Sequence, residues 1–464
     1  MAQAGREVLV LEERATLGGG AASASLTLPG FVHDPFAAVF PIAAASPFFR
    51  SLGLERHGLT WIESPAPLAH PLDDGTAIVQ YRSVEQTAAG LRTDRDVYQT
   101  LMKPLVSRSD GLTADLLAPP GGQRHLLTLA RFGPHAVRSA SGFACSYFHG
   151  DQARALFAGN AAHSFLPLES WLTAGFGLFM GLLGHAVGWP VAKGGSASLA
   201  AALVAEAEAR GVTFELERPV RSLADVPPAH AIFFDTDPRQ MAEIAGPALP
   251  ARFRRQLRRH RYGPGAFKVD YALDGPVPWT AEGCLQAATV HLGGTLEEIA
   301  RSEREVEQGR HAEHPFVLVS QPSLFDPSRA PVGQQTLWAY CHVPAGSEVD
   351  MTERIERQIE RFAPGFRDRI LARHVMSPHD LHAANANLVG GAINGGLQDL
   401  RSYFQWTLSW PSPYATPNPR LFRCSAATPP GGGVHGMAGF HAAEYALGWR
   451  ARWRARRRSR PAAM

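Results

Sequence analysis

Residues 421–447 read LFRCSAATPPGGGVHGMAGFHAAEYAL, which is an apolar strand, a loop with three consecutive glycines, and a helix. A glycine-rich loop that enters a helix presents free backbone N–H groups and the positive end of the helix dipole. The segment therefore predicts a binding site for an electron-rich ligand, and a plain turn is the alternative. The predicted contact residues are Gly431, Gly432, Gly433, Val434, His435 and Gly436.

A second segment, EVLVLEERATLGGG at residues 7–20, begins with an apolar run typical of a parallel strand buried on both faces. Gly5 suits the end of a preceding helix. An acid at the end of such a strand can accept hydrogen bonds from a ribose hydroxyl, and glycines after it let the backbone approach a dinucleotide. Arg14 is either a phosphate ligand or a surface residue. The candidate binding residues here are Glu12, Arg14, Gly18, Gly19 and Gly20.

A third segment, PVAKGGSASLAAAL at residues 190–203, predicts a helix with Ser196 as its N-cap. Gly211 ends the helix, and VTFEL at 212–216 predicts the next strand. AIFF at 231–234 is a further apolar strand. An ordinary helix and strand without a ligand is the alternative interpretation of this segment.

Together, the three segments resemble the split FAD-binding domain of the phytoene desaturase-like flavoproteins, which are relatives of the amine oxidases. HDPFAAVFPIAAASPFF at 33–49, RYGPGAFKVDYALDGPVPW at 261–279 and PSLFDPSRAP at 322–331 are most similar to one branch. That branch contains the "pyridine nucleotide-disulfide oxidoreductase domain-containing protein 2"-like proteins. The resemblance implies bound FAD, with residues 12–20 at the adenosine ribose, Val220 near the adenine, and residues 431–436 under the isoalloxazine ring.

The implied fold is α/β: a split Rossmann-like FAD-binding domain with an inserted α+β substrate domain. We assign the FAD-binding domain to residues 1–58, 186–240 and 406–449. The substrate domain then covers 59–185 and 241–405, with antiparallel strands expected between Trp61 and Arg82. Thr295 with Glu298, and Asp350 with Glu353, predict capping boxes at two helix starts. Residues 450–464 are predicted to be a basic, disordered tail.

One expected element has no counterpart in the sequence. A GxGxxG loop should precede the acid by about 20 residues, whereas Glu12 follows only eleven residues. We therefore expect Met1 to lie in the first Rossmann helix, and residues 7–12 to form the second strand, inside a parallel sheet. Two explanations are open: a start codon assigned too late, or a true fragment, in which FAD binding would be in doubt.

Composition excludes several classes of protein. Of 464 residues, 45% are hydrophobic and 19% charged, which supports a large buried core. The net charge is +3, but seven arginines lie between Arg450 and Arg460, so the remaining chain is slightly acidic and does not suggest a nucleic-acid enzyme. Four cysteines without CxxC or Cys/His spacing predict a cytoplasmic, reducing environment, no metal site and no disulfide reductase chemistry.

Residues 170–192 contain no Asp, Glu, Lys or Arg, but they include five glycines and His185. We interpret the stretch as buried helix and loop that line an apolar cavity. Peripheral membrane contact is the second interpretation, and a bilayer span, which needs about 20 apolar residues, is the third.

The resemblance implies an FAD-dependent oxidoreductase that transfers a hydride between flavin and an apolar substrate, such as an isoprenoid or other long chain. The alternatives are a flavin-dependent isomerase and a non-catalytic interaction protein with the same fold. In flavoenzymes the cofactor carries the redox chemistry, so a catalytic triad is not required. His435 is the one catalytic candidate, and a backbone-bonded loop histidine is its alternative interpretation. His291, Tyr340 and His342 are interpreted as structural.

Overall fold

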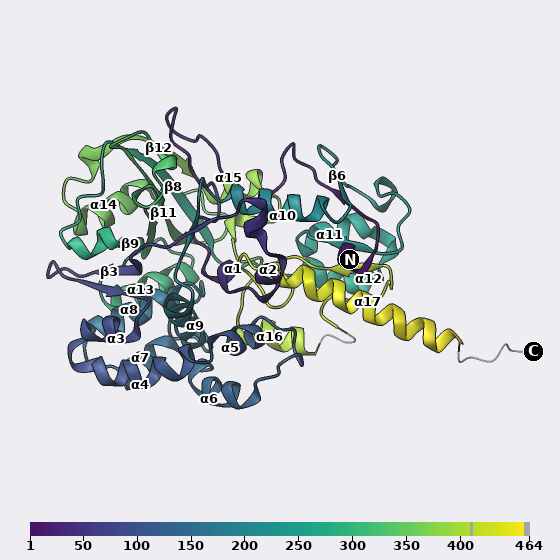
Figure 1. Ribbon diagram of the computed structural model, residues 1–464, viewed down its shortest axis with the longest axis horizontal. Helices are drawn as coiled ribbons and strands as arrows, with labels where there is room; N and C mark the ends of the chain where they lie inside the picture. Colours follow the sequence, from purple (N-terminus) through teal and green to yellow (C-terminus); the bar gives the residue numbers. More distant parts are fainter. Residues whose placement is uncertain (409–411, 459–464) are drawn as a thin grey trace, which may run out of the picture.

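The computed structural model describes residues 1–408 and 412–458, with side chains to residue 448. Its largest element is a seven-stranded sheet with the order β12-β8-β11-β10-β9-β3-β4 (Figure 1). Each neighbouring pair is antiparallel except β3 and β9, which run parallel. The strands are β3 (Ala66–Pro71), β4 (Ala77–Gln80), β8 (Gly265–Leu273), β9 (Ala287–Leu292), β10 (Val317–Ser320), β11 (Gln335–Val343) and β12 (Ile370–Met376).

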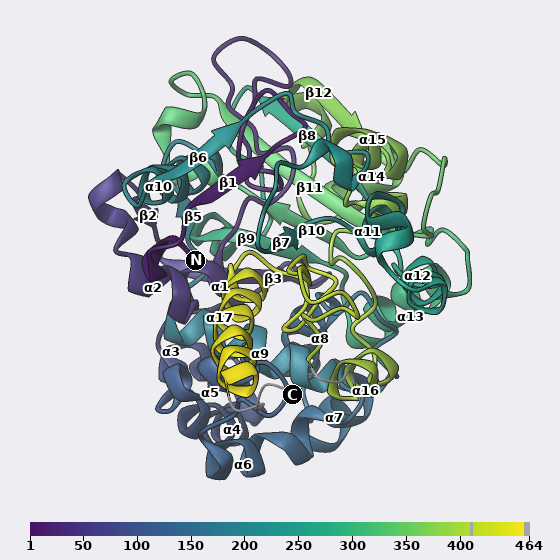
Figure 2. The ribbon, with the colours of Figure 1, turned by 90° about the vertical axis from the view of Figure 1, so that its right-hand side faces the viewer.

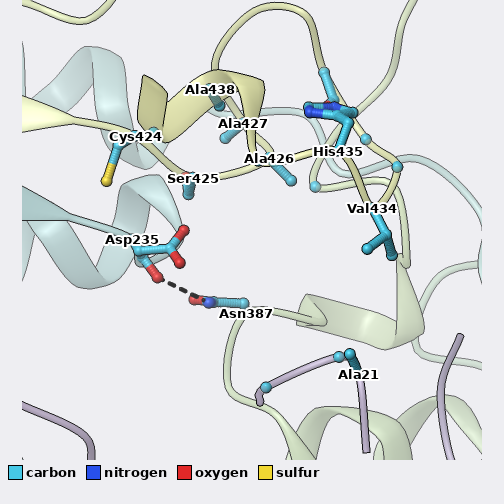
Figure 3. Close-up of a pocket in the computed structure, with 18 of the residues that line it drawn as sticks. Ala21, Asp235, Asn387, Cys424, Ser425, Ala426, Ala427, Val434, His435 and Ala438 are labelled. Atoms are coloured by element: carbon cyan, nitrogen blue, oxygen red, sulfur yellow. Dashed lines mark hydrogen bonds between the residues drawn. The ribbon is translucent and has the colours of Figure 1, made fainter. Parts of the chain in front are cut away.

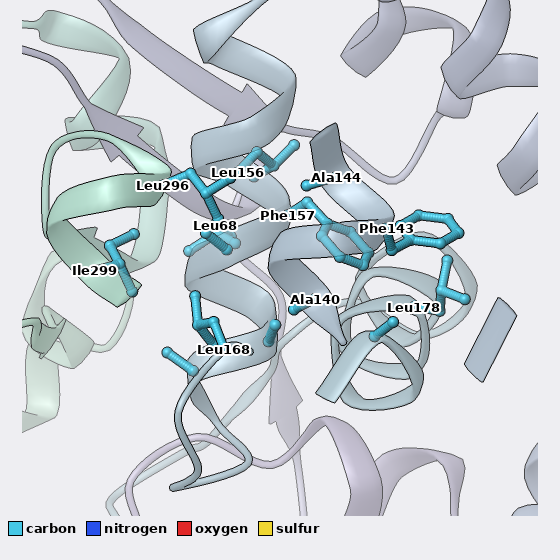
Figure 4. Close-up of a cluster of buried hydrophobic side chains, with 14 of the residues drawn as sticks. Leu68, Ala140, Phe143, Ala144, Leu156, Phe157, Leu168, Leu178, Leu296 and Ile299 are labelled. Carbon is cyan, nitrogen blue, oxygen red and sulfur yellow. The ribbon is translucent and has the colours of Figure 1, made fainter. Parts of the chain in front are cut away.

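Helices cover both faces of this sheet. α14 (Thr352–Phe362) buries Ile355, Ile359 and Phe362 against one face. The other face contacts α8 (Asp151–Ala162), α9 (Thr173–Ala186) and α13 (Leu296–Glu307), whose apolar side chains form one large core (Figure 4). The helices α3 (Val84–Ala89), α4 (Arg95–Val106), α5 (Ser109–Leu116), α6 (Leu126–Ala136) and α7 (Ala140–Tyr147) extend this layer. Within the described residues, no helix is both long enough and apolar enough to cross a bilayer.

Two short parallel strand pairs form the second part of the fold (Figure 2). β1 (Val8–Leu11) pairs with β6 (Val212–Glu215), and β7 (Ile232–Phe234) pairs with β13 (Leu421–Arg423). The accompanying helices are α10 (Ala197–Glu208), α11 (Pro238–Ala245), α12 (Ala251–Arg258) and α17 (Met437–Arg458). These are the three sequence segments that predicted a dinucleotide-binding unit.

The first strand is parallel, as predicted, but it is not internal. β1 has β6 as its partner on one edge, and among residues 1–408 and 412–458 no strand pairs with its other edge. Gly5 ends a 3₁₀ helix (Ala2–Ala4) in the left-handed conformation, with φ of 66°, as its position before the strand indicated.

Two local predictions were wrong, and a third holds in position only. Ser196 is the N-cap residue of α10, as predicted, but its hydroxyl donates to the Ala37 carbonyl and caps no helical N–H. Asp350 forms no capping box, because Met351 is the N-cap of α14 and Asp350 accepts instead from the Thr352 N–H. α17 runs to Arg458, so residues 450–458 are helical and not a disordered tail; residues 459–464 lie outside the described chain. The capping box of Thr295 and Glu298 is confirmed.

The remaining elements connect the two parts. The antiparallel pair β2 (Trp61–Ile62) and β5 (Val191–Ala192) joins the chain before β3 to the turn before α10. α1 (Pro41–Ala45) and α2 (Pro47–Leu52) contact α9 and the start of α17. α15 (Pro378–Ala384) and α16 (Leu400–Thr407) precede the glycine loop of α17.

Candidate functional site

A single cavity of about 2690 Å³ lies between the two parts of the fold. It is larger than the ~300–1,000 Å³ typical of small-molecule pockets, so it has room for a large cofactor together with a substrate. Every binding residue predicted from the sequence lines this cavity. They are Glu12, Arg14, Gly18, Gly19, Gly20, Val220, Gly431, Gly432, Gly433, Val434, His435 and Gly436.

One end of the cavity is formed by the two parallel strand pairs. β1 and β7 both line it, and each carries its partner strand on the edge away from it. Glu12 and Asp235 follow these strands at their carboxyl ends, which is where open α/β sheets bind ligands. Asp235 is exposed to the cavity, but the protein packed around its carboxyl, together with the charge of Glu12, raises its pKa to about 6.

Asp235 was not predicted, although the sequence shows an acid directly after an apolar strand. Figure 3 shows the Asp235 side chain beside Ser425, with Asn387 below it, and His435 with Val434 on the opposite side. The Asn387 side chain donates to the Asp235 carbonyl at 3.1 Å and accepts from the Asp237 N–H at 2.8 Å. Asn387 therefore fixes the start of α11 at the cavity wall.

The glycines in the loops are required by close backbone contacts. A Cβ at Gly18, where φ is +127°, would lie 2.6 Å from the Ala21 carbonyl oxygen. A Cβ at Gly432 would lie 2.7 Å from the Asn394 carbonyl oxygen and 2.8 Å from its Cα. A side chain at residue 432 would therefore clash with the backbone of Asn394. Its effect on a bound ligand would follow from the displaced loop.

The glycine loop ends at the N-terminus of α17, as predicted. The Ala438 and Gly439 residues of its first turn line the cavity, and their N–H groups donate to no residue that the structure describes. Free N–H groups at a helix start favour an electron-rich or anionic ligand.

His435 does not have the geometry of a catalytic residue. Its Nε2 donates to the Gly431 carbonyl at 3.1 Å, and its Nδ1 accepts from the Met437 N–H at 3.0 Å. Burial lowers its pKa to about 4, so the ring is neutral. Since both ring nitrogens bond to backbone, we assign His435 to holding the loop in shape, which was the alternative interpretation from the sequence.

A buried ion pair joins three of the segments that carry the family resemblance. Arg329 Nη2 donates to Asp34 Oδ2 at 2.7 Å, and both side chains are 1% exposed. Asp34 Oδ1 also accepts from the Ser196 N–H at 2.9 Å, and Asp326 accepts from the Gly194 N–H at 2.6 Å. No local pattern predicts these contacts, because the partners are more than 130 residues apart.

The other end of the cavity lies between α9 and the seven-stranded sheet, and aromatic side chains dominate its wall. These are Phe165, Phe176, Phe179, Trp189, Trp338 and Tyr340. The predicted uncharged stretch thus lines the cavity through Phe176 and Phe179. Leu178 and Leu182 belong to the same stretch, but they are buried in the core behind the wall.

The sheet face toward this end carries polar groups. Lys268 is ion-paired with Asp270 on β8, and burial lowers the pKa of its ammonium while the Asp270 carboxylate opposes this shift. Several buried polar atoms on the sheet have no hydrogen-bond partner within the described residues, which is unusual in folded proteins. They include Asp270 Oδ1, Thr289 Oγ1, His291 Nδ1 and Ser320 Oγ.

The fold and the site define an FAD-dependent oxidoreductase with the architecture of the flavin amine oxidases. The model of that family matches residues 1–446, and the chain belongs to the flavin-containing amine oxidoreductase family. A Rattus norvegicus protein described as "Pyridine nucleotide-disulfide oxidoreductase domain-containing protein 2" is 23% identical, over 95% of this chain and 89% of the rat protein. This match confirms the branch that the sequence motifs suggested.

Solved structures show the same fold. An oxidoreductase from Methanosarcina mazei superposes with a TM-score of 0.63 at 14% identity, over 94% of this chain and 93% of the other. Putrescine oxidase bound to putrescine gives a TM-score of 0.60 at 17% identity, over 97% and 94%. At such identities the similarity concerns the fold alone.

Both groups of residues that the sequence predicted for FAD lie on the wall of this cavity. Glu12 and Arg14 would hold its ribose and phosphate, and residues 431–436 would hold its flavin ring, as the family resemblance implies.

Proposed function

We propose that the protein transfers a hydride between FAD and an apolar, elongated substrate that lies in the aromatic end of the cavity. Bound FAD supplies the two-electron chemistry. The observation that carries the proposal is the continuity of one cavity from the glycine loop of α17 to the aromatic wall of α9 and the sheet. A substrate in that end has direct access to the place that residues 431–436 offer to the flavin.

The charges around the aromatic end favour an uncharged substrate. The acidic residues of the cavity wall lie at its strand end or near the loop before α6, and they are Glu7, Glu12, Glu13, Asp115, Asp235 and Asp237. At the aromatic end the charged residue of the wall is Lys268, a cation. Burying a cationic substrate beside Lys268 without a free carboxylate would be costly. A diamine such as putrescine therefore suits this wall less well than a neutral chain.

The test is to add a candidate substrate to the FAD-loaded protein without oxygen. Reduction of the flavin is measured as loss of its visible absorbance. Geranylgeraniol, a neutral isoprenoid alcohol, should reduce the flavin, whereas putrescine should not. Phe176→Asp, on the cavity wall, should abolish the reduction. Phe404→Asp, on α16 and 62% exposed, is the matched control and should leave it unchanged. Reduction by putrescine alone would contradict the proposal.

The isomerase alternative makes a different prediction. An isomerase would leave the oxidised flavin unbleached and would convert its substrate only after prior chemical reduction of FAD. Chromatography of the products under both conditions separates the two functions.

A further inference from the structure

Three histidines, two of them buried, lie in a row between the sheet and α8. They are His70 on β3, His291 on β9, and His163, which directly follows α8. His163 Nε2 lies 3.0 Å from His291 Nε2, so one of these rings donates to the other. His70 Nε2 lies 2.7 Å from the Gly294 carbonyl oxygen. The Nδ1 atoms of His70 and His291 have no hydrogen-bond partner among residues 1–408 and 412–458.

Gly159 on α8 shows how closely these rings approach the helix. A Cβ at residue 159 would lie 2.6 Å from His291 Nδ1 and 3.2 Å from His70 Nδ1. Both unpartnered nitrogens therefore border the same point of the helix, and a side chain at residue 159 would displace them. The close packing of the two rings against α8 therefore depends on glycine at the residue where they meet.

The hydrogen bonds determine which nitrogens carry protons. A carbonyl oxygen can only accept, so His70 must donate through Nε2, and its Nδ1 holds a lone pair. His291 Nδ1 borders the same point, and a proton there avoids two opposed lone pairs in a region of low dielectric. His291 Nε2 then accepts, His163 donates through Nε2, and His163 Nδ1 carries a lone pair.

His163 ends the row at the cavity. It is half-buried, it lines the cavity wall, and its Nδ1 bonds to no residue that the structure describes. All three rings are neutral: burial lowers the pKa of His70 to about 4 and that of His163 to about 3, and it holds the pKa of His291 well below its usual range. The Nδ1 lone pair thus offers one neutral hydrogen-bond acceptor to a ligand.

We propose that His163 determines substrate specificity by accepting a hydrogen bond at Nδ1 from the hydroxyl group of an otherwise apolar substrate, with His291 and His70 as positioning residues. The inference rests on the proposed function and adds a substrate class, an apolar alcohol. The surroundings of His163 fit such a molecule. Trp189 stands edge-on to His163, with ring centroids 5.2 Å apart, and Phe165 with Tyr340 continues the apolar wall.

The experiment compares two ligands that differ in one donor. Geranylgeraniol has a hydroxyl, whereas its methyl ether has the same chain but no donor. Isothermal titration calorimetry of the FAD-loaded protein should show roughly tenfold tighter binding of the alcohol, which is the upper range for one neutral hydrogen bond. Equal affinities, or tighter binding of the ether, would overturn the inference.

Three variants locate the acceptor. His163→Phe keeps a planar ring but should lose the preference for the alcohol. His291→Phe leaves His163 intact but removes the acceptor that fixes its tautomer, so the preference should also fall to near unity. Tyr340→Phe removes a different hydroxyl from the same wall and should keep the preference. A preference that survives in His163→Phe, or disappears only in Tyr340→Phe, contradicts the proposal.

The tautomer of the His163 ring can be measured without a ligand and without turnover. In ¹⁵N-histidine spectra, the resonances lost in His163→Phe should be those of a ring protonated at Nε2, with an unprotonated Nδ1. Protonation at Nδ1 would overturn the inference. If the affinity preference holds but geranylgeraniol never reduces the flavin, the specificity site stands and the proposed reaction fails.

Discussion

Replacement of Asp34 by asparagine tests the buried ion pair that joins the segments around the cavity. The substitution keeps the size of the side chain but removes the negative charge from Arg329, whose guanidinium is 1% exposed. Arg329 would retain one further bond, from Nε to the Val32 carbonyl at 3.0 Å. An uncompensated buried charge costs about 3–5 kcal/mol in comparable proteins.

That cost converts into a measurable change in melting temperature. With about 2.1 cal/mol/K per residue, cooperative unfolding of 464 residues has an entropy of roughly 1 kcal/mol/K. Asp34→Asn should therefore lower the Tm by about 3–5 °C in scanning calorimetry. The matched control is Asp110→Asn, whose pair with Arg50 has a similar distance of 2.8 Å but side chains 84% and 45% exposed. An exposed pair contributes about 0–1 kcal/mol, so the control should change the Tm by about 1 °C or less.

The double variant Asp34→Asn with Arg329→Met completes the test. Removing both charges eliminates the unpaired guanidinium, so the double variant should recover at least half of the loss. Two results would refute the reasoning: an effect of Asp34→Asn no larger than that of Asp110→Asn, or strictly additive losses in the double variant.

Three further predictions follow from burial and contact. Leu178→Ala, in the core behind the cavity, should cost about 2–5 kcal/mol in urea unfolding, whereas Leu127→Ala, which is 83% exposed, should change stability by less than about 0.5 kcal/mol. Gly432→Ala should reduce FAD content after gel filtration because its Cβ meets the Asn394 backbone, whereas Gly133→Ala, on α6 away from the cavity wall and with no atom within 4 Å of the added Cβ, should retain FAD. Burial lowers the pKa of His435 to about 4, so the unfolded chain takes up a proton first as pH falls. Its contribution to stability, complete above pH ~6.5, should be lost between pH ~6.5 and about 4, and this part of the urea-midpoint profile should be absent in His435→Gln.

Local patterns in the sequence identified the strands and the ligand loops. The apolar runs at 8–11, 212–215 and 232–234 form parallel strands, because β-branched and aromatic residues favour extended backbone. The expected burial of residues 8–11 on both faces was wrong, since β1 is only partly buried and Leu9 is 39% exposed. The glycine runs became wall segments of one cavity, since only glycine allows the positive φ values and the close contacts found at Gly18 and Gly433. The cofactor followed from these segments together with the family resemblance.

Other features depend on residues that are distant in sequence and were decided by tertiary packing. The sequence around Asp34 does not predict its partner Arg329, and the sequence around His163 does not predict its partner His291. Each pair forms only when the sheet packs against the helices and loops around it. Leu178 and Phe179 are neighbours in one apolar stretch, yet one fills the core and the other faces the cavity, since the rotation of α9 against α8 sets their directions. The role of His435 was likewise decided by the loop geometry, which gives both its nitrogens to the backbone.

The sequence by itself thus determined the fold class, because local periodicity and glycine at fixed positions carry it, and the family resemblance added the cofactor. The residues around the cofactor stay a prediction, although each of them lines the cavity. The tertiary structure decided which polar groups become buried partners and which face the substrate. Long-range pairing is not encoded in any one segment. Burial makes these pairs important for stability, because a buried polar or charged group that loses its partner is costly.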